Sequence, residues 1–220
     1  MTQRIFGKAP LAVTIFLLLM AALVVAVYLK WQRANVDLAA VVEPSVLRIV
    51  PQPIPVPEAT LTRMDGAAFG RKDLTGKWTF LYFGYTLCPD VCPTELSALA
   101  GVADILRQKG VRAPWQMVFV SVDPERDTPD QLAKFVTYFD PGIIAATGAQ
   151  TELRIMAQPI GVGWEKAALP TANDAPSSAY LINHTTSILL INPQGEMVGA
   201  FPTPHAPEAM AKAFQAVIHE

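Results

Sequence analysis

Residues 78–109 read WTFLYFGYTLCPDVCPTELSALAGVADILRQK. Residues 78–83 are an apolar run rich in strand-forming residues, which predicts a buried strand. Residues 94–109 have the apolar spacing of a helix and are followed by a glycine, as helices commonly are. Between the two lie Cys88 and Cys92, the 2 cysteines of the chain. We therefore expect both thiols at a strand-to-helix turn, where the N–H groups of the helix favour thiolate over thiol.

Strand and helix patterns alternate along the rest of the folded part of the chain. We expect a hairpin over 61–69 with its turn at Asp65-Gly66, a second buried strand over 115–122, helices over 128–139 and 151–160, a hairpin formed by 187–191 and 197–201, and a last helix over 207–219. Alternating strands and helices with a hairpin near the end indicate an α/β fold with a mixed central sheet.

Residues 9–29 contain no charged side chain, and an apolar run of this length is long enough to cross a bilayer as a helix. The apolar part of a cleaved signal peptide is shorter, about 7–15 residues, so we predict a transmembrane helix instead. Tyr28 and Trp31 are typical of the interface belt at the end of such a helix.

Orientation follows from the short tail of residues 1–8, which has cationic residues and no acidic one. We expect this tail in the cytoplasm and the remaining chain outside it. No Arg- and Ser-rich transit segment precedes the apolar run. The sequence therefore predicts a single-pass protein of the bacterial inner membrane whose C-terminal domain faces the periplasm.

Residues 30–58 separate the predicted membrane helix from the predicted domain, 59–220. Prolines stand at positions 44, 51, 53, 55 and 57, and alternating proline favours an extended, polyproline-like backbone. We interpret this segment as a semi-rigid stalk, with an edge strand as the alternative for its last few residues only.

The overall charge gives no sign of nucleic-acid binding. The formal net charge is −2, the isoelectric point is about 5.9, and the lysines and arginines are dispersed along the sequence. A nucleic-acid-binding protein would cluster basic residues on one face. We exclude nucleic acid as a partner.

The C-x3-C spacing of Cys88 and Cys92 allows both sulfurs to converge on one point. A structural disulfide, a redox dithiol and a soft-metal site are the three interpretations. The first is disfavoured, because so short a loop constrains the unfolded chain little. The residues alone leave the other two open.

A third ligand would favour a metal, and the chain has 3 histidines. His219 is next to the C-terminus, and His205 lies in a proline-rich loop that we expect on the surface. His184 directly precedes the buried strand of residues 187–191. A single histidine in that position is more often a hydrogen-bonded structural residue than a ligand, so the pattern by itself does not assign it to a metal.

Three ordered motifs resemble the Sco/SenC family of membrane-anchored, thioredoxin-like copper proteins. They are FGYTLCPDVCPTEL at 83–96, VSVDPERDTP at 120–129 and NHTTSILLI at 183–191. The resemblance extends over about residues 55–220. It implies a thioredoxin-like fold and copper, as Cu(I) or Cu(II), held by Cys88, Cys92 and His184.

The same resemblance implies a function and partners. It predicts a metallochaperone that assists assembly of the dinuclear copper centre of cytochrome c oxidase. The partners would be the copper-bearing subunit of the oxidase and a protein that donates copper. Two thiolates and an imidazole suit three-coordinate Cu(I), whereas zinc would usually add a fourth ligand.

Three further residues of these motifs bear on the predicted copper site. The family commonly has an acidic residue before the histidine, and this chain has Asn183, which predicts weaker binding of Cu(II). Asp123 and Asp127 are candidate outer-sphere carboxylates. The simpler interpretation is that Asp123 shapes a turn with Pro124 and that Asp127 caps the helix beginning at Thr128.

The alternative function is a membrane-tethered thiol–disulfide oxidoreductase that acts on client proteins. Cys88 would be the attacking thiolate and Cys92 the resolving thiol. The thioredoxin motif is C-x-x-C, so the additional residue argues against a close functional copy. Peroxide reduction is a weaker option, because Tyr85 stands where that family has a threonine. We expect an assembly factor, with redox activity as an alternative or additional role.

Overall fold

The computed structural model describes residues 11–34, 42–168 and 180–218. The described residues form two compact units, one of residues 11–34 and one of residues 42–168 and 180–218. The second unit contains the main sheet and both cysteines. It begins before residue 59, where the sequence pattern placed the start of the folded domain.

The first unit contains helix α1, Leu11–Ala34, which includes most of the predicted membrane segment. Its large apolar side chains are exposed over the part whose side chains are described, Val13–Val27. Within the residues that the structure describes, no helix combines the length and the apolar character needed to cross a membrane. The transmembrane helix of residues 9–29 therefore stays a prediction.

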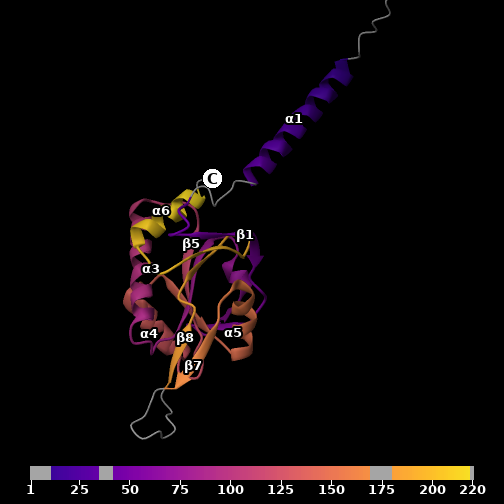
Figure 1. Ribbon diagram of the computed structural model, residues 1–220. Helices are drawn as coiled ribbons and strands as arrows, with labels where there is room; N and C mark the ends of the chain where they lie inside the picture. The colour runs from indigo at the N-terminus through magenta and orange to yellow at the C-terminus, as the bar shows by residue number, and fades with distance from the viewer. Residues whose placement is uncertain (1–10, 35–41, 169–179, 219–220) are drawn as a thin grey trace, which may run out of the picture. The chain divides into compact units, whose positions relative to one another are not determined.

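The second unit is built on an eight-stranded sheet with the strand order β1-β10-β9-β4-β5-β6-β2-β3 (Figure 1). The strands are β1 Arg48–Pro55, β2 Leu61–Arg63, β3 Ala68–Phe69, β4 Trp78–Gly84, β5 Trp115–Ser121, β6 Ile143–Thr147, β9 Ile188–Ile191 and β10 Glu196–Phe201. Strands β4, β5 and β6 are parallel, and the other neighbours are antiparallel. The predicted mixed sheet is confirmed.

The helices of this unit are α3 Val91–Gln108, α4 Pro129–Phe139, α5 Gln150–Ala157 and α6 Pro207–Ile218, with short 3-10 turns η1 at Arg71–Leu74 and η2 at Gln158–Ile160. Helices α3, α4 and α6 lie on one side of the sheet and α5 lies on the other (Figure 1). Strand β4 followed by α3, and the hairpin β9–β10 followed by α6, give the thioredoxin-like arrangement that the sequence motifs implied.

Aromatic side chains of the core pack against β4 and hold it in position. Phe80 of β4 stacks on Phe201 of β10 with ring centroids 5.7 Å apart and contacts Phe214 of α6 at 5.0 Å. All three side chains are fully buried. Burial of aromatic side chains stabilises a fold by about 2–3 kcal/mol each. The strand that leads to the cysteines is therefore held by its pairing with β5 and β9 and by aromatic packing against β10 and α6.

The proline-rich stalk predicted for residues 30–58 is wrong over its second half. Strand β1 pairs with β10 as the last strand of the sheet, and Leu47 and Val56 on either side of it are completely buried. The N–H of Val56 donates inward to the carbonyl of Gly195 (3.0 Å), so Pro53 and Pro55, at alternating positions, have their nitrogens on the outward edge. Proline is tolerated there because no ladder hydrogen bond is lost.

A second, two-stranded sheet is formed by β7, Trp164–Ala168, and β8, Tyr180–His184. Neither strand was predicted, and neither was β6. The predicted hairpins at 61–69 and around 192–195 are confirmed by the β2–β3 and β9–β10 pairings. The small sheet matters for the site, because His184 is its last residue.

Candidate metal centre

The cysteines lie where β4 leads into α3. The sequence pattern placed the helix at residues 94–109, but α3 begins at Val91 with Asp90 as its N-cap residue. Pro93 is tolerated in the first turn, because the N–H groups there have no partner within the helix. Cys92 is thus part of α3 and Cys88 lies in the loop before it. The backbone N–H of Cys92 points to the sulfur of Cys88 at 3.4 Å.

Gly84, the last residue of β4, makes room for the sulfur of Cys92. A Cβ atom at this position would lie 2.8 Å from Cys92 Sγ and 2.9 Å from a ring carbon of Phe119. Both distances are far below ordinary van der Waals contact. Only glycine allows the first turn of α3 to approach the strand this closely.

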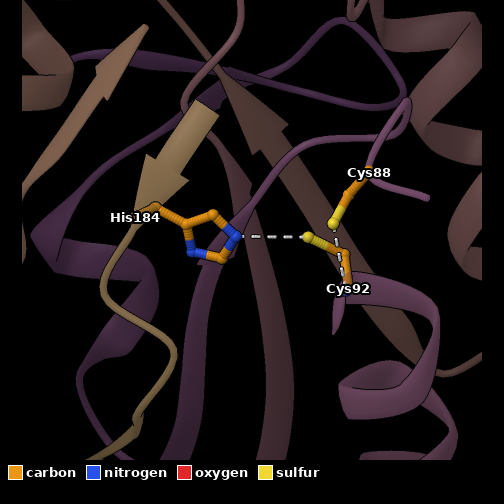
Figure 2. Close-up of side chains that lie close together, drawn as sticks. All are labelled: Cys88, Cys92 and His184. Carbon is orange, nitrogen blue, oxygen red and sulfur yellow. Dashed lines mark hydrogen bonds between the residues drawn. The ribbon is translucent and has the colours of Figure 1, made fainter. Parts of the chain in front are cut away.

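His184 completes the cluster from the opposite side (Figure 2). Its Nε2 atom is 3.4 Å from Cys92 Sγ, and its Nδ1 atom is 2.9 Å from the carbonyl oxygen of Thr185. A carbonyl only accepts, so Nδ1 carries the proton and donates it, which leaves the lone pair of Nε2 directed at the sulfur. The donor atoms of Cys88, Cys92 and His184 all lie within 4.8 Å of one another.

Strand β8 is held in place by the loop after β5. Arg126 Nη1 donates to the carbonyl oxygen of Tyr180 at 3.0 Å, and its guanidinium lies 3.7 Å from the centre of the Tyr180 ring. Asp123 is fully buried, pairs with Arg126, and accepts a hydrogen bond from the Tyr180 hydroxyl at 2.8 Å. The backbone N–H of Ile182 donates to the hydroxyl of Tyr85 at 3.3 Å. These contacts position His184 relative to the dithiol.

Asp127 has a different role from the helix cap that the sequence predicted. Thr128 is the N-cap residue of α4, and it forms a reciprocal capping box with Gln131. Asp127 instead accepts hydrogen bonds from the backbone N–H and the hydroxyl of Thr86, at 2.9 and 2.6 Å. Its carboxylate therefore fixes the loop that leads to Cys88. The prediction for Asp123 was also incomplete, because that residue binds β8 in addition to its place in the turn.

The two thiols have opposite electrostatic environments. A hydrogen bond from Cys92, supported by His184 and by backbone N–H groups, holds the pKa of the Cys88 thiol far below its ordinary value. The interaction with Cys88 and burial together raise the pKa of the Cys92 thiol. In the neutral range the metal-free pair therefore carries one negative charge, on Cys88, and one proton, on Cys92.

The site is accessible along one side. A groove runs past the cluster and is lined by Tyr85, Cys88, Pro89, Val91, Leu181 and His184, among others. The side chain of Leu87 beside it is 59% exposed. Cys88 is therefore the sulfur that a partner molecule reaches first, while Cys92 is completely buried.

The other two histidines do not join the cluster within the described residues. His219 lies outside the described part of the chain. His205 was expected on the surface, but its side chain is only 1% exposed and pairs with Glu95 of α3. Its Nε2 donates to the carbonyl oxygen of Phe201 at 2.8 Å. The buried carboxylate of Glu95 requires a partner, and the loop containing His205 folds over α3 to supply it.

Comparison with known proteins gives consistent matches. A family model described as SCO1/SenC matches residues 55–219. The chain is 38% identical over 147 residues to the mitochondrial SCO1 homolog 1 of Arabidopsis thaliana, which is 66% of this chain and 42% of that protein. It is 34% identical over 142 residues to the human mitochondrial SCO1 homolog, covering 64% of this chain and 46% of that protein. The chain thus spans less than half the length of these relatives.

Solved structures agree with the sequence matches. The structure of Arabidopsis thaliana ScoI with copper bound has a TM-score of 0.65 and 32% identity, and the match covers 77% of this chain and 98% of that one. The structure of Bradyrhizobium japonicum ScoI with copper bound has a TM-score of 0.62 and 34% identity, covering 74% and 99%. The family match over residues 55–219 includes the dithiol turn and the two-stranded sheet of this chain.

Proposed function

The chain belongs to the SCO1/SenC family, and on that premise we propose that it is a copper-binding metallochaperone that assists assembly of the dinuclear copper centre of cytochrome c oxidase. One observation carries the proposal: two sulfurs and one imidazole nitrogen, from segments 92 residues apart in sequence, lie within 4.8 Å of one another. Copper-bound relatives of the same fold support copper as the metal.

The donor set fits copper. Metal bonds to sulfur and to imidazole are about 2.0–2.3 Å long, so three donors around one ion are about 4 Å apart. Cys92 Sγ and His184 Nε2 are already 3.4 Å apart, and Cys88 requires only a small adjustment. Two thiolates and a neutral imidazole suit three-coordinate Cu(I), and added water completes a tetragonal site for Cu(II). The ligands proposed are Cys88, Cys92 and the Nε2 atom of His184.

Copper is the cargo in this proposal. The protein receives it from a donor protein and passes it to the copper-bearing subunit of the oxidase. The accessible groove beside Cys88 supports this role, because an incoming ligand of a partner can approach the ion from that side. Transfer then proceeds by exchange of ligands from the side of this groove.

We also propose that residues 9–29 anchor the chain in the inner membrane and that the domain faces the periplasm. The uncharged run and the exposed apolar side chains of α1 support this topology. A reporter enzyme that is active only after export, fused to the C-terminus, should be active in intact cells. An inactive fusion, with a cytoplasmic reporter active instead, would reverse the topology.

The copper proposal is tested with the full-length chain, purified in detergent without oxygen. We expect one copper per chain, loss of that copper in Cys88→Ser and Cys92→Ser, and at least a hundredfold weaker binding in His184→Ala. His205→Gln is the matched control, because it alters a buried histidine that pairs with Glu95 instead of sulfur. Copper affinity that is unchanged in His184→Ala would show that the ligand set is wrong.

A thiol–disulfide oxidoreductase is the second candidate, and the low pKa of the Cys88 thiol favours it. The Cys88 thiolate would attack a client disulfide, form a mixed disulfide and release one client thiolate. Cys92, after losing its proton, would attack the sulfur of Cys88 and release the second client thiolate, leaving the protein oxidised. His184→Ala separates the two functions, because it should weaken copper binding and retain reduction of a disulfide-bonded peptide.

A further inference from the structure

Tyr82 lies in β4, directly beneath the cluster. Its ring centroid is 6.0 Å from that of His184 and 6.0 Å from that of Phe119. Side chains two residues apart on a strand share a face, so Tyr82 is on the same face of β4 as Gly84, the position against which Cys92 Sγ packs. The phenol is completely buried.

The hydroxyl group of Tyr82 has no hydrogen-bond partner among the described residues. Buried polar groups in folded proteins are nearly always bonded, and one that is not requires an explanation. The other tyrosines near the site differ from Tyr82. The hydroxyl of Tyr85 accepts a hydrogen bond from the N–H of Ile182, and the hydroxyl of Tyr180 donates one to Asp123. An unbonded hydroxyl next to a proposed ligand points to a state of the site in which it is bonded.

A Cβ atom at Gly84 would lie 3.2 Å from Tyr82 Cε1 and 2.8 Å from Cys92 Sγ, so the edge of the Tyr82 ring and the Cys92 sulfur converge on the same point of β4. Burial and, after it, the Cys92 sulfur raise the pKa of Tyr82, with smaller contributions from Glu95 and Cys88. The phenol is therefore a neutral donor throughout the physiological range. Glu95 already has His205 as its partner. The Cys92 sulfur is the acceptor that remains.

We propose that the Tyr82 hydroxyl donates a hydrogen bond to the Cys92 sulfur when that sulfur is a copper-bound thiolate, which makes Tyr82 a positioning residue of the site. This inference rests on the proposed function. A thiol sulfur is a weak acceptor and a thiolate is a strong one. A ligating sulfur is a thiolate, so copper binding makes the Cys92 sulfur a strong acceptor for the buried hydroxyl.

The hydrogen bond has a predictable effect on the metal. A donor to a ligating sulfur stabilises the negative charge of the thiolate and makes it less electron-rich, which stabilises the Cu(I) complex and favours it over the Cu(II) complex. It also lowers the energy of the sulfur orbitals, so the sulfur-to-copper(II) charge-transfer absorption moves to shorter wavelength. Removing the hydroxyl should reverse both effects.

The test is Tyr82→Phe in the full-length chain in detergent, because this change deletes the hydroxyl and keeps the ring. We expect three results together. The metal-free protein keeps its thermal stability or gains some, since an unbonded buried group is removed. Its Cu(I) affinity, measured by competition with a chelator, falls about tenfold, as expected for a hydrogen bond to a charged acceptor. The charge-transfer band of the copper(II) form moves to longer wavelength.

Tyr138→Phe is the matched control, because it deletes the hydroxyl of a phenol that is 86% exposed and should change none of these quantities. A Tyr82→Phe protein that is less stable without metal, yet has the parent's copper affinity and absorption band, would overturn the inference. If the parent itself binds no copper, the proposed function is wrong and this inference is wrong with it. If the parent binds copper and the variant is identical to it, the inference alone is overturned.

Discussion

Cys88 and Cys92 follow β4, an inner strand of the eight-stranded sheet, whereas His184 is the last residue of a separate two-stranded sheet. Beneath the cysteines, β4 and β5 are apolar and completely buried, as at Phe80 and Phe119. Around the histidine strand it is polar, and the strand is held by the contacts of Arg126, Tyr85 and Asp123.

The site thus has a sulfur half, Cys88 and Cys92, and a histidine half, His184 on β8. The difference between them indicates how each half responds to substitution. The separation of the two sulfurs is set by packing that the whole domain shares, so altering it also alters stability. The distance from His184 to the sulfurs depends on a few hydrogen bonds, so it can change while the core stays folded. A copper carrier benefits from this arrangement, because one ligand can move without loss of the other two.

The largest expected effect concerns the protons of the sulfur half. Because Cys88 is already a thiolate and Cys92 keeps its proton, copper binding should release one proton from the dithiol. Copper affinity should therefore rise with pH, by about a hundredfold from ~pH 7.5 to ~pH 9.5. A chelator competition at several pH values, with a pH indicator to count released protons, measures this. Release of two protons would mean that both sulfurs are thiols in the metal-free protein.

Gly84→Ala should damage the sulfur half next most strongly. The added Cβ lies 2.8 Å from Cys92 Sγ, so the first turn of α3 must move away from β4. We expect a loss of about 1–3 kcal/mol in the free energy of unfolding and a loss of copper affinity of about thirtyfold. Gly163→Ala is the control, because a Cβ at that position meets no atom within 4 Å. Equal effects of the two substitutions would refute the steric explanation.

Arg126→Lys tests the histidine half. Lysine keeps the charge beside Asp123 but lacks the planar fork that reaches the carbonyl oxygen of Tyr180. We expect copper affinity to fall about fivefold while the unfolding free energy falls by about 1 kcal/mol. Arg154→Lys is the control, since Arg154 stacks on Trp164 of the neighbouring strand. If copper affinity is unaffected and stability falls sharply, Arg126 belongs with the core instead.

The smallest effect is expected at Asn183. This residue is exposed and lies beside His184 at the edge of the groove. Asn183→Asp adds a negative charge near the cation, so Cu(II) affinity should rise about two- to threefold at low salt and less at high salt. Titrations at two salt concentrations measure the change. A decrease in Cu(II) affinity would contradict the electrostatic account.

The sulfur half could be predicted from the sequence and the histidine half could not be predicted from its pattern. The apolar run before Cys88 and the helical spacing after Cys92 are local signals that agree with each other. Strands β7 and β8 are five residues each, and what holds β8 in place is Arg126, which is 54 residues from Tyr180 in sequence. Contacts over such separations leave no periodicity, so only the resemblance singled out His184.

Two other errors have the same origin. The prolines of residues 48–55 favoured a stalk, whereas the structure has an edge strand there. The apolar residues Leu47, Ile54 and Val56 were the sequence signal for that strand. His205 seemed to be a surface residue because its neighbours are prolines. Its partner is Glu95, which is 110 residues away, and no local pattern connects the two. Buried polar pairs of this kind depend on tertiary structure alone.

Strand β1 has one more consequence, for the behaviour of the domain in solution. An open sheet edge presents free N–H and C=O groups and invites pairing with another chain, which leads to aggregation. Here the nitrogens of Pro53 and Pro55 on the outer edge of β1 cannot donate, and the strand at the other end of the sheet, β3, is only two residues long. Both margins of the sheet are therefore poor templates for strand addition, so self-association through this sheet is disfavoured even when the domains are crowded together.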